Sequence, residues 1–167
     1  MSKVSETTRN RLTAQGFVDL TDDEVVKLNY WLRLAPAVCM IWVAIGVVLA
    51  SPVVLLSLVP FALLGGILQG HPFDSIYNHA LRHLTGGPAL PAYGRPRRFG
   101  CLMASVMIAS VAVLFASGLD TVARILGAIM IGMAAINVTT GFCVPSAIYA
   151  LMFGRPVACG FEPRKTS

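Results

Sequence analysis

Four apolar stretches dominate the hydrophobic pattern of this chain. They cover residues 34–50, 52–68, 99–117 and 121–139, and each holds 17 to 19 residues. At about 1.5 Å of rise per residue, a helix of that length comes close to spanning a hydrocarbon core about 30 Å thick. The pattern therefore predicts an all-α membrane protein with four transmembrane helices.

The connections between the stretches predict how these helices pair. Ser51 and residues 117–120 leave room only for tight turns, so the four spans should form two tandem hairpins. Neither turn contains Lys or Arg, and both should face away from the cytoplasm. Asp120 and Arg124 lie one helical turn apart and should pair near the outer interface.

A polar segment precedes the first stretch. It contains no apolar region or cleavage site of a signal peptide, so we expect residues 1–20 to be a flexible cytoplasmic tail. Thr21 and Glu24 have the spacing of a capping box, and Leu20 and Val25 that of a hydrophobic staple. A helix should therefore start at about Asp22 and run through Trp31 toward the membrane.

The segment between the hairpins has two parts. A short amphipathic helix should begin after Asp74 as N-cap, stop at Gly86, and lie in the cytoplasmic headgroup plane. Residues 86–97 hold several Gly and Pro residues and predict an extended basic loop. The helix should present an apolar face formed by Phe73, Ile76, Tyr77, Ala80, Leu81 and Leu84.

The expected organisation follows from these segments. It comprises a tail (1–20), a first hairpin with flanking interfacial helices (21–85), a basic loop (86–97), a second hairpin with a broken C-terminal helix (98–155) and a second tail (156–167). The two hairpins share a weak pattern: each starts at an arginine, turns at a serine and returns to a glycine. We interpret it as an internal repeat, with Arg33, Ser51 and Gly70 matching Arg98, Ser117 and Gly141.

Composition and charge agree with a membrane protein. Hydrophobic residues make up 56% of the chain and charged residues 13%, which leaves too little polar surface for a soluble domain. The net charge is +5, yet twelve of the thirteen Lys and Arg residues lie in the two tails and the central segment. That distribution follows the positive-inside rule rather than indicating nucleic-acid binding. We expect a multi-pass protein of a cell inner membrane, with both termini cytoplasmic.

Several short motifs resemble a bacterial family of small integral membrane proteins described only as a domain of unknown function. The likeness covers about residues 20–155, and it is carried by His71-Pro72-Phe73-Asp74, Tyr77-Asn78, Arg82, Leu90-Pro91, Arg97-Arg98-Phe99 and Gly141-Phe142-Cys143. More distantly, the chain is similar to the two-helix membrane module of membrane-bound rhodaneses. That module is understood to pair with a second copy, so the chain resembles a fused pair. Some relatives carry a second cysteine shortly after Gly-Phe-Cys, where this chain has Val144, Pro145 and Ser146.

Two histidines are the only candidates for metal binding. His79 and His83 have the i, i+4 spacing that can place two imidazoles on one ion. A third ligand is not evident, so both are better interpreted as polar residues beside Arg82 that face lipid phosphates. We predict no metal and no cofactor.

Four cysteines occur without any C-x-x-C pair. Cys39 and Cys101 are interpreted as small packing residues of helix contacts. Cys143 differs, because Gly141 and Pro145 predict a break between two helices around it. The start of the second helix and the nearby cations Arg98 and Arg155 would favour a thiolate there.

Function remains divided between two classes. No acidic residue, Lys or His lies in the middle of a span, which disfavours a pump, and Asn137 should form a hydrogen bond between helices. With no catalytic constellation visible, we favour a non-catalytic scaffold or accessory subunit over an enzyme. Its partners would be membrane lipids, another membrane or cytoplasmic protein, or a second copy of the chain. The alternative is a thiol or sulfur carrier that works through Cys143. The scaffold would present a basic face formed by Arg82, Arg95, Arg97 and Arg98.

Overall fold

A computed structural model describes residues 5–17, 21–68, 70–85 and 89–154 of the chain. These residues are helical almost throughout, and no strand occurs among them. The elements are α1 (Glu6–Ala14), α2 (Asp22–Trp31), α3 (Leu34–Val48), α4 (Pro52–Ile67), α5 (Pro72–Ile76), the π-helix η1 (Tyr77–Leu81), α6 (Arg82–Thr85), α7 (Arg95–Ala116), α8 (Asp120–Thr140) and α9 (Val144–Phe153).

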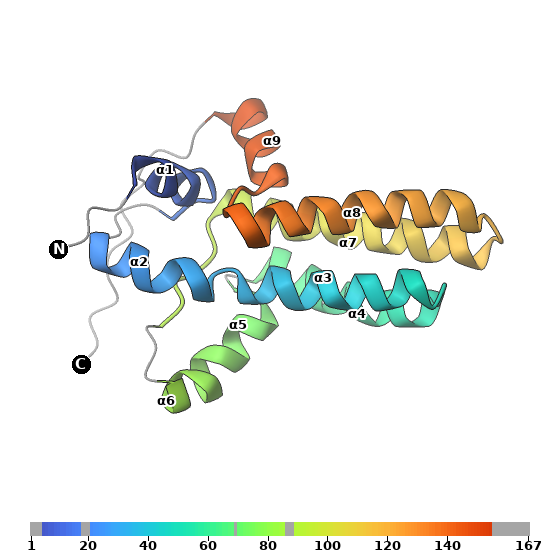
Figure 1. The fold of residues 1–167 in the computed structure, drawn as a ribbon, viewed down its shortest axis with the longest axis horizontal. Coiled ribbons are helices and arrows are strands. Elements are labelled where there is room, and N and C mark those ends of the chain that lie inside the picture. Colours follow the sequence, from blue (N-terminus) through green and yellow to red (C-terminus); the bar gives the residue numbers. More distant parts are fainter. Residues whose placement is uncertain (1–4, 18–20, 69, 86–88, 155–167) are drawn as a thin grey trace.

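Four of these helices, α3, α4, α7 and α8, lie side by side along the longest axis of the molecule (Figure 1). Two tight turns join them at one end. In the first, Ala50 has φ 46°, and Ser51 then caps α4 by accepting a hydrogen bond from the Val54 amide at 3.4 Å. In the second, Gly118 has φ 75°, a conformation that glycine adopts without strain. The chain can therefore reverse within three or four residues at both places.

The core of the bundle lies where α4 packs against α7 and α3 packs against α8. Small residues permit close approach: a Cβ on Gly127 would lie 2.5 Å from Val47, and one on Gly66 would lie 2.6 Å from Leu102. The outward faces remain apolar, as they are in a lipid-facing helix. The buried core consists of Val43, Val47, Leu55, Leu58, Ala62, Ile108, Val111, Ala112, Phe115, Ala123 and Met130.

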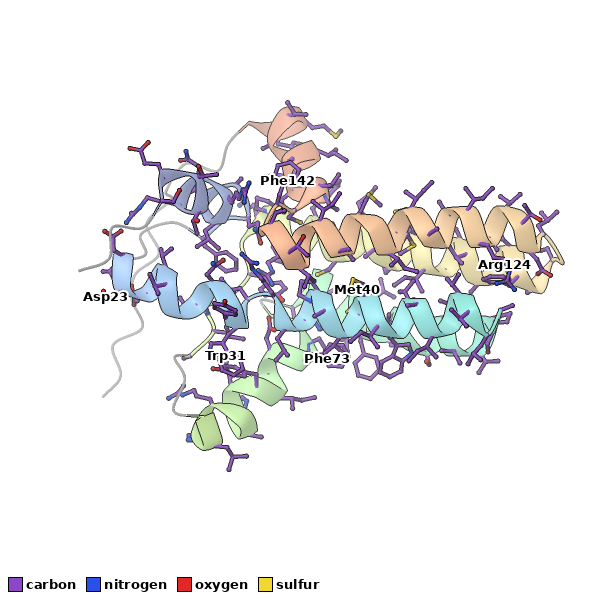
Figure 2. All side chains as sticks on the ribbon, viewed as in Figure 1. Asp23, Trp31, Met40, Phe73, Arg124 and Phe142 are labelled. Atoms are coloured by element: carbon purple, nitrogen blue, oxygen red, sulfur yellow. The ribbon has the colours of Figure 1, made fainter. Side chains whose placement is uncertain are left out.

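Arg124 lies near the turn end of this bundle (Figure 2). Instead of the expected ion pair with Asp120, which does not form in the described part of the chain, it donates to the Val47 carbonyl at 3.4 Å. Its guanidinium also lies 5.9 Å from the centre of the Phe115 ring. The cation is therefore held by α3 and α7 rather than by its own helix.

A second hydrophobic cluster covers the opposite end of the bundle. It joins α1 and α2 to the segment before α7, and it includes Leu12, Phe17, Val25, Leu28, Leu32, Tyr77, Leu90 and Tyr93. Residues 6–14 thus form a packed helix inside the segment that the sequence predicts to be a flexible tail, while residues 1–4 and 18–20 lie outside the described residues. Contacts across the sequence account for the difference, because Gly16 approaches Gly94 so closely that a Cβ on either would nearly touch the other's backbone.

Helix α2 begins at Asp22, as the sequence predicts. The Thr21 amide donates to the Glu24 carboxylate at 3.0 Å, and the Thr21 hydroxyl donates to the same oxygen at 2.8 Å. The capping box that the sequence predicts is therefore present. Leu20, the other half of the predicted staple, lies outside the described residues.

The helix after α4 differs from the prediction in its start, its regularity and its face. It is bent by 79° from α4, begins at Pro72 with His71 rather than Asp74 as N-cap, and loosens into η1 after Ile76. Asp74 and Tyr77 are its buried residues, while Ile76 and Leu84 are exposed. The predicted stop at Gly86 lies outside the described residues.

The number of helices that can cross a membrane depends on this bend. Residues 22–48 taken as one run, α7 and α8 are each long and apolar enough. A fourth is added if α4 and the helix over residues 72–84 count together. Three to four such helices indicate a membrane protein.

Candidate functional site

A cavity of about 310 Å³ lies where the bundle meets the N-terminal helices. One part of its wall is rich in sulfur, because five of the seven methionines and three of the four cysteines face it. Met40 projects from α3 into the space beside α8 (Figure 2). The sulfur-bearing lining residues are Cys39, Met40, Cys101, Met103, Met107, Met130, Met133 and Cys143.

The three cysteines come from three different elements. Cys39 belongs to α3, Cys101 to α7, and Cys143 is the N-cap of α9; all three are free and half-buried. A Cβ on Gly100 would lie 3.9 Å from the Cys143 sulfur, so this thiol sits against the first turns of α7. The predicted helix break around Cys143 is thus present, with Gly141 at φ 73° as the C-cap of α8.

His71 connects two of these thiols. Its Nε2 lies 3.8 Å from the Cys39 sulfur, and its Nδ1 accepts from the Phe73 amide at 3.4 Å. A neutral imidazole with Nδ1 as acceptor carries its proton on Nε2, the nitrogen that faces Cys39. A Cβ on Gly65 would lie 2.6 Å from the His71 ring and 3.3 Å from the Cys101 sulfur. The ring therefore fills the space between α3 and α4, beside both cysteines.

Arg97 occupies the polar end of the cavity instead of the outer surface. Its side chain is 6% exposed, and it donates to the Gln15 amide oxygen at 3.3 Å and to the Leu32 carbonyl at 2.5 Å. The guanidinium lies 4.4 Å from the Tyr93 ring centre and 5.2 Å from that of Phe17. The prediction that Arg97 belongs to an exposed basic face is therefore wrong. Helices α1 and α2, which cover this residue, were not visible as a packed unit in the sequence.

The other predicted members of the basic face are divided. Arg95 is exposed and Arg82 is half-buried. Arg98 turns toward α4, where it donates to the Gly66 carbonyl at 3.0 Å and to the Ile67 carbonyl at 2.6 Å. Two of the four arginines thus serve contacts inside the protein.

Two further buried polar groups lie beside this site. Asp74 is 3% exposed and interacts with the Tyr93 side chain, while Tyr77 is fully buried and its hydroxyl has no hydrogen-bond partner in the described part of the chain. Tyr93, in the segment before α7, is buried as well, and this burial raises the pKa of its phenol well above the ordinary value. Tyr93 therefore stays protonated and keeps its hydroxyl as a donor.

Gln15 links the cavity to the break before Cys143. While its oxygen accepts from Arg97, its side-chain nitrogen donates to the Gly141 carbonyl at 2.7 Å. Asn137 also lines the cavity, but the predicted hydrogen bond between helices does not form among the described residues. The long side chains of Gln15, Arg11 and Arg33 donate to carbonyls at the end of α8 instead.

The histidines proposed as weak metal candidates lie away from this site. His79 and His83 are exposed, and His79 Nδ1 lies 2.8 Å from the Ser75 carbonyl of its own helix. Across residues 5–17, 21–68, 70–85 and 89–154, no group of three or more His, Cys, Asp or Glu side chains is placed to hold a metal ion.

Sequence reasoning missed the cavity itself, although one signal was available. Cys39, Cys101 and Cys143 each fall within a few residues of the same predicted membrane interface. Cysteines at the same depth in the membrane can come together from antiparallel helices. Their wide separation in the sequence makes this proximity hard to recognise. Arg97 and His71 carried no comparable signal.

Comparison with known proteins identifies the family and no more. No curated protein and no solved structure matches the chain. The distant likeness to the membrane module of rhodaneses stays a prediction. Residues 29–153 match the family described as Domain of unknown function (DUF4395), and the chain belongs to that family.

Proposed function

We propose that this chain is a thiol or sulfur carrier of a bacterial inner membrane, with four spans arranged as two tandem hairpins and both termini in the cytoplasm. One observation supports the carrier role above the others: three cysteines from three elements face a single cavity, with an imidazole beside two of them. A lone buried cysteine is usually a packing residue. Three thiols around one space can pass a group from one to the next.

The simplest step is transfer of sulfane sulfur from a persulfide on a partner molecule. The Cys143 thiolate attacks the terminal sulfur of the donor, R–S–SH, and a new S–S bond forms as the old one breaks. The donor leaves as a thiolate and Cys143 holds the persulfide, so no external oxidant or reductant is needed. Cys143 is the best entry point because it lies in a break between helices rather than inside one.

The scaffold role has less support from the geometry. It depended on four arginines forming one basic face, and Arg97 and Arg98 point into the protein. Arg82 and Arg95 remain available to anionic lipid, a membrane partner, a cytoplasmic partner or a second copy. We therefore rank the scaffold role below the carrier role.

Thiol mapping on the full chain in native membranes tests the carrier role. Membranes would be treated with glutathione persulfide, then with an alkylating reagent, and each cysteine would be scored by mass spectrometry. We expect Cys143 to gain sulfane sulfur first, and Cys143→Ser to lower the loading of Cys101 and Cys39 by about tenfold if transfer passes through it.

Cys159, which lies outside the described residues, serves as the comparison within the same molecule. The carrier proposal is wrong if Cys143 is protected in native membranes or is loaded no faster than Cys159. A matched Cys159→Ser variant should leave loading at Cys143 unchanged.

A further inference from the structure

Arg97 is a buried cation with no carboxylate in direct contact. No carboxylate lies within ion-pair distance of it in the described part of the chain, where the one ion pair joins Arg9 and Asp22. Asp74 is buried too and lies close enough to Arg97 to interact with it electrostatically, yet no hydrogen bond connects the two side chains. Burial of an uncompensated charge is costly, and proteins normally offset it with a counter-ion. The guanidinium therefore has no counter-ion within ion-pair distance in the described part of the chain.

The guanidinium is positioned to receive that charge. Two of its five N–H donors are used, by Gln15 and Leu32, which leaves three donors. The rings of Phe17 and Tyr93 fix its plane, and Arg97 itself forms part of the cavity wall. A planar fork of this kind pairs with an oxyanion through two parallel hydrogen bonds.

Apart from a few polar groups, among them His71 and Asn137, the rest of the cavity wall is apolar. From Arg97 it follows α7 to Met107, ten residues further on and about 15 Å along the helix axis. Opposite this stretch lie Met130 and Ile131 of α8. The volume of about 310 Å³ is at the lower end of the range for small-molecule sites. One charge at one end and a narrow apolar body describe a single-chain amphiphile.

We infer that the cavity binds a single-chain carboxylate of the fatty-acid type, with its head group on Arg97 and its tail among the methionines of α7 and α8. A strongly hydrated dianion would leave its second charge uncompensated in an apolar space, and a two-chain phospholipid would exceed the volume. Flexible methionine side chains suit an alkyl chain, because they adapt to irregular shapes. This site goes beyond the thiol chemistry and does not depend on it.

Photolabelling of the full chain in native membranes tests the inference. The probe is dodecanoic acid with a diazirine near the end of the tail, compared with the matching alcohol and with a phospholipid that carries the same acyl chain. We expect the acid to label the cavity-facing residues of α7 and α8 about tenfold more than the alcohol does, because only the acid can pair with Arg97. The phospholipid should label the outward faces only.

Paired variants test recognition of the head group and of the tail independently. Arg97→Gln should reduce labelling by the acid to the level of the alcohol, whereas Arg95→Gln, an exposed neighbour with the same loss of charge, should stay within twofold. Ala134→Phe fills the cavity from α8 and should abolish labelling by the acid, whereas Ala128→Phe on an exposed position of that helix should not.

The labelling results support or overturn the proposed fatty-acid site as follows. Equal labelling of the cavity by acid and alcohol in the unmodified chain, or cavity labelling by the phospholipid, would overturn it. The comparison of probes needs no variant, so it holds even if Arg97→Gln fails to fold. A variant with Ser at positions 39, 101 and 143 should keep the labelling, so failure of the carrier proposal and failure of this one are distinguishable.

Discussion

At the scale of single residues, the lack of a side chain on Gly65 determines where the His71 ring packs. Gly65 lies in α4, and the imidazole packs against its Cα with the Cys101 sulfur beside it. His71 is also the N-cap of α5, so the same contact fixes where the chain leaves the bundle. One glycine thus positions a thiol, an imidazole and a helix start.

Gly65→Ala should therefore destabilise the protein despite the better helix propensity of alanine. A Cβ at 2.6 Å from the His71 ring forces the ring to move, and overpacking of this kind costs about 1 to 3 kcal/mol. The measurement is thermal unfolding of the purified protein in detergent. Gly132→Ala is the matched control, because nothing lies within 4 Å of that position, and there alanine should stabilise α8 by up to about 1 kcal/mol. Equal effects at both positions would contradict this account.

At the scale of elements, the two long helix pairs cap each other's ends. Arg33, which precedes α3, donates to the Val138 and Thr139 carbonyls at the end of α8 at 2.9 and 2.8 Å. Arg98, near the start of α7, donates to two carbonyls at the end of α4. The last carbonyls of a helix lack partners within it, and a cation there also opposes the negative end of the helix dipole. The exchange is reciprocal, as an internal repeat would require, although the repeat itself stays a prediction.

Removal of either arginine should loosen the helix that it caps, not its own helix. Arg98→Gln should cost about 1 to 3 kcal/mol, since a hydrogen bond to a charged donor contributes about that much. Hydrogen exchange should speed up in the last turn of α4, whereas Arg33→Gln should produce the same change in the last turn of α8. Arg95→Gln, exposed on α7, should stay within about 0.5 kcal/mol. Faster exchange in α7 rather than α4 would show that the arginine acts in another way.

The elements were largely predictable because their signals are local. The apolar stretches end within a few residues of α3, α4 and α8, and α2 begins at the expected residue. Helix α7 begins four residues before its apolar stretch, since Pro96 fits a first helical turn. The N-cap of α5 was misassigned because both His71 and Asp74 can cap a helix, and only the contact with α4 selects between them. The burial of Arg97 depends on α1 and α2, which the local pattern could not place.

At the scale of the whole molecule, the two ends of the bundle differ in character. The tight turns at residues 49–51 and 117–119 form one end, while α1, α2 and the segment before α7 gather at the other (Figure 1). Most of the cations lie in the tails and the central segment, as the positive-inside rule requires of a cytoplasmic side. The proposed topology thus assigns the cavity to the cytoplasmic half.

Reporter fusions test this orientation directly. Fusions after Ser51 and after Leu119 should be active only with a reporter that folds outside the cytoplasm, and fusions after Gly94 and at the C-terminus only with a cytoplasmic reporter. The charge distribution determines this result, so moving two arginines into the 117–120 turn should weaken the external signal there. A cytoplasmic signal at either turn of the unmodified chain would contradict the four-span arrangement.

The exchanged arginines also impose an order on biosynthesis. A ribosome makes the chain from its N-terminus, so in the proposed topology α3 and α4 enter the membrane before Arg98 exists. Until the 31 residues after Ile67 have been added, the last carbonyls of α4 lack the donor that Arg98 supplies, and Arg33 lacks its acceptors on α8 for longer still. The first hairpin therefore cannot complete its helix-end hydrogen bonds until the second hairpin has been synthesised.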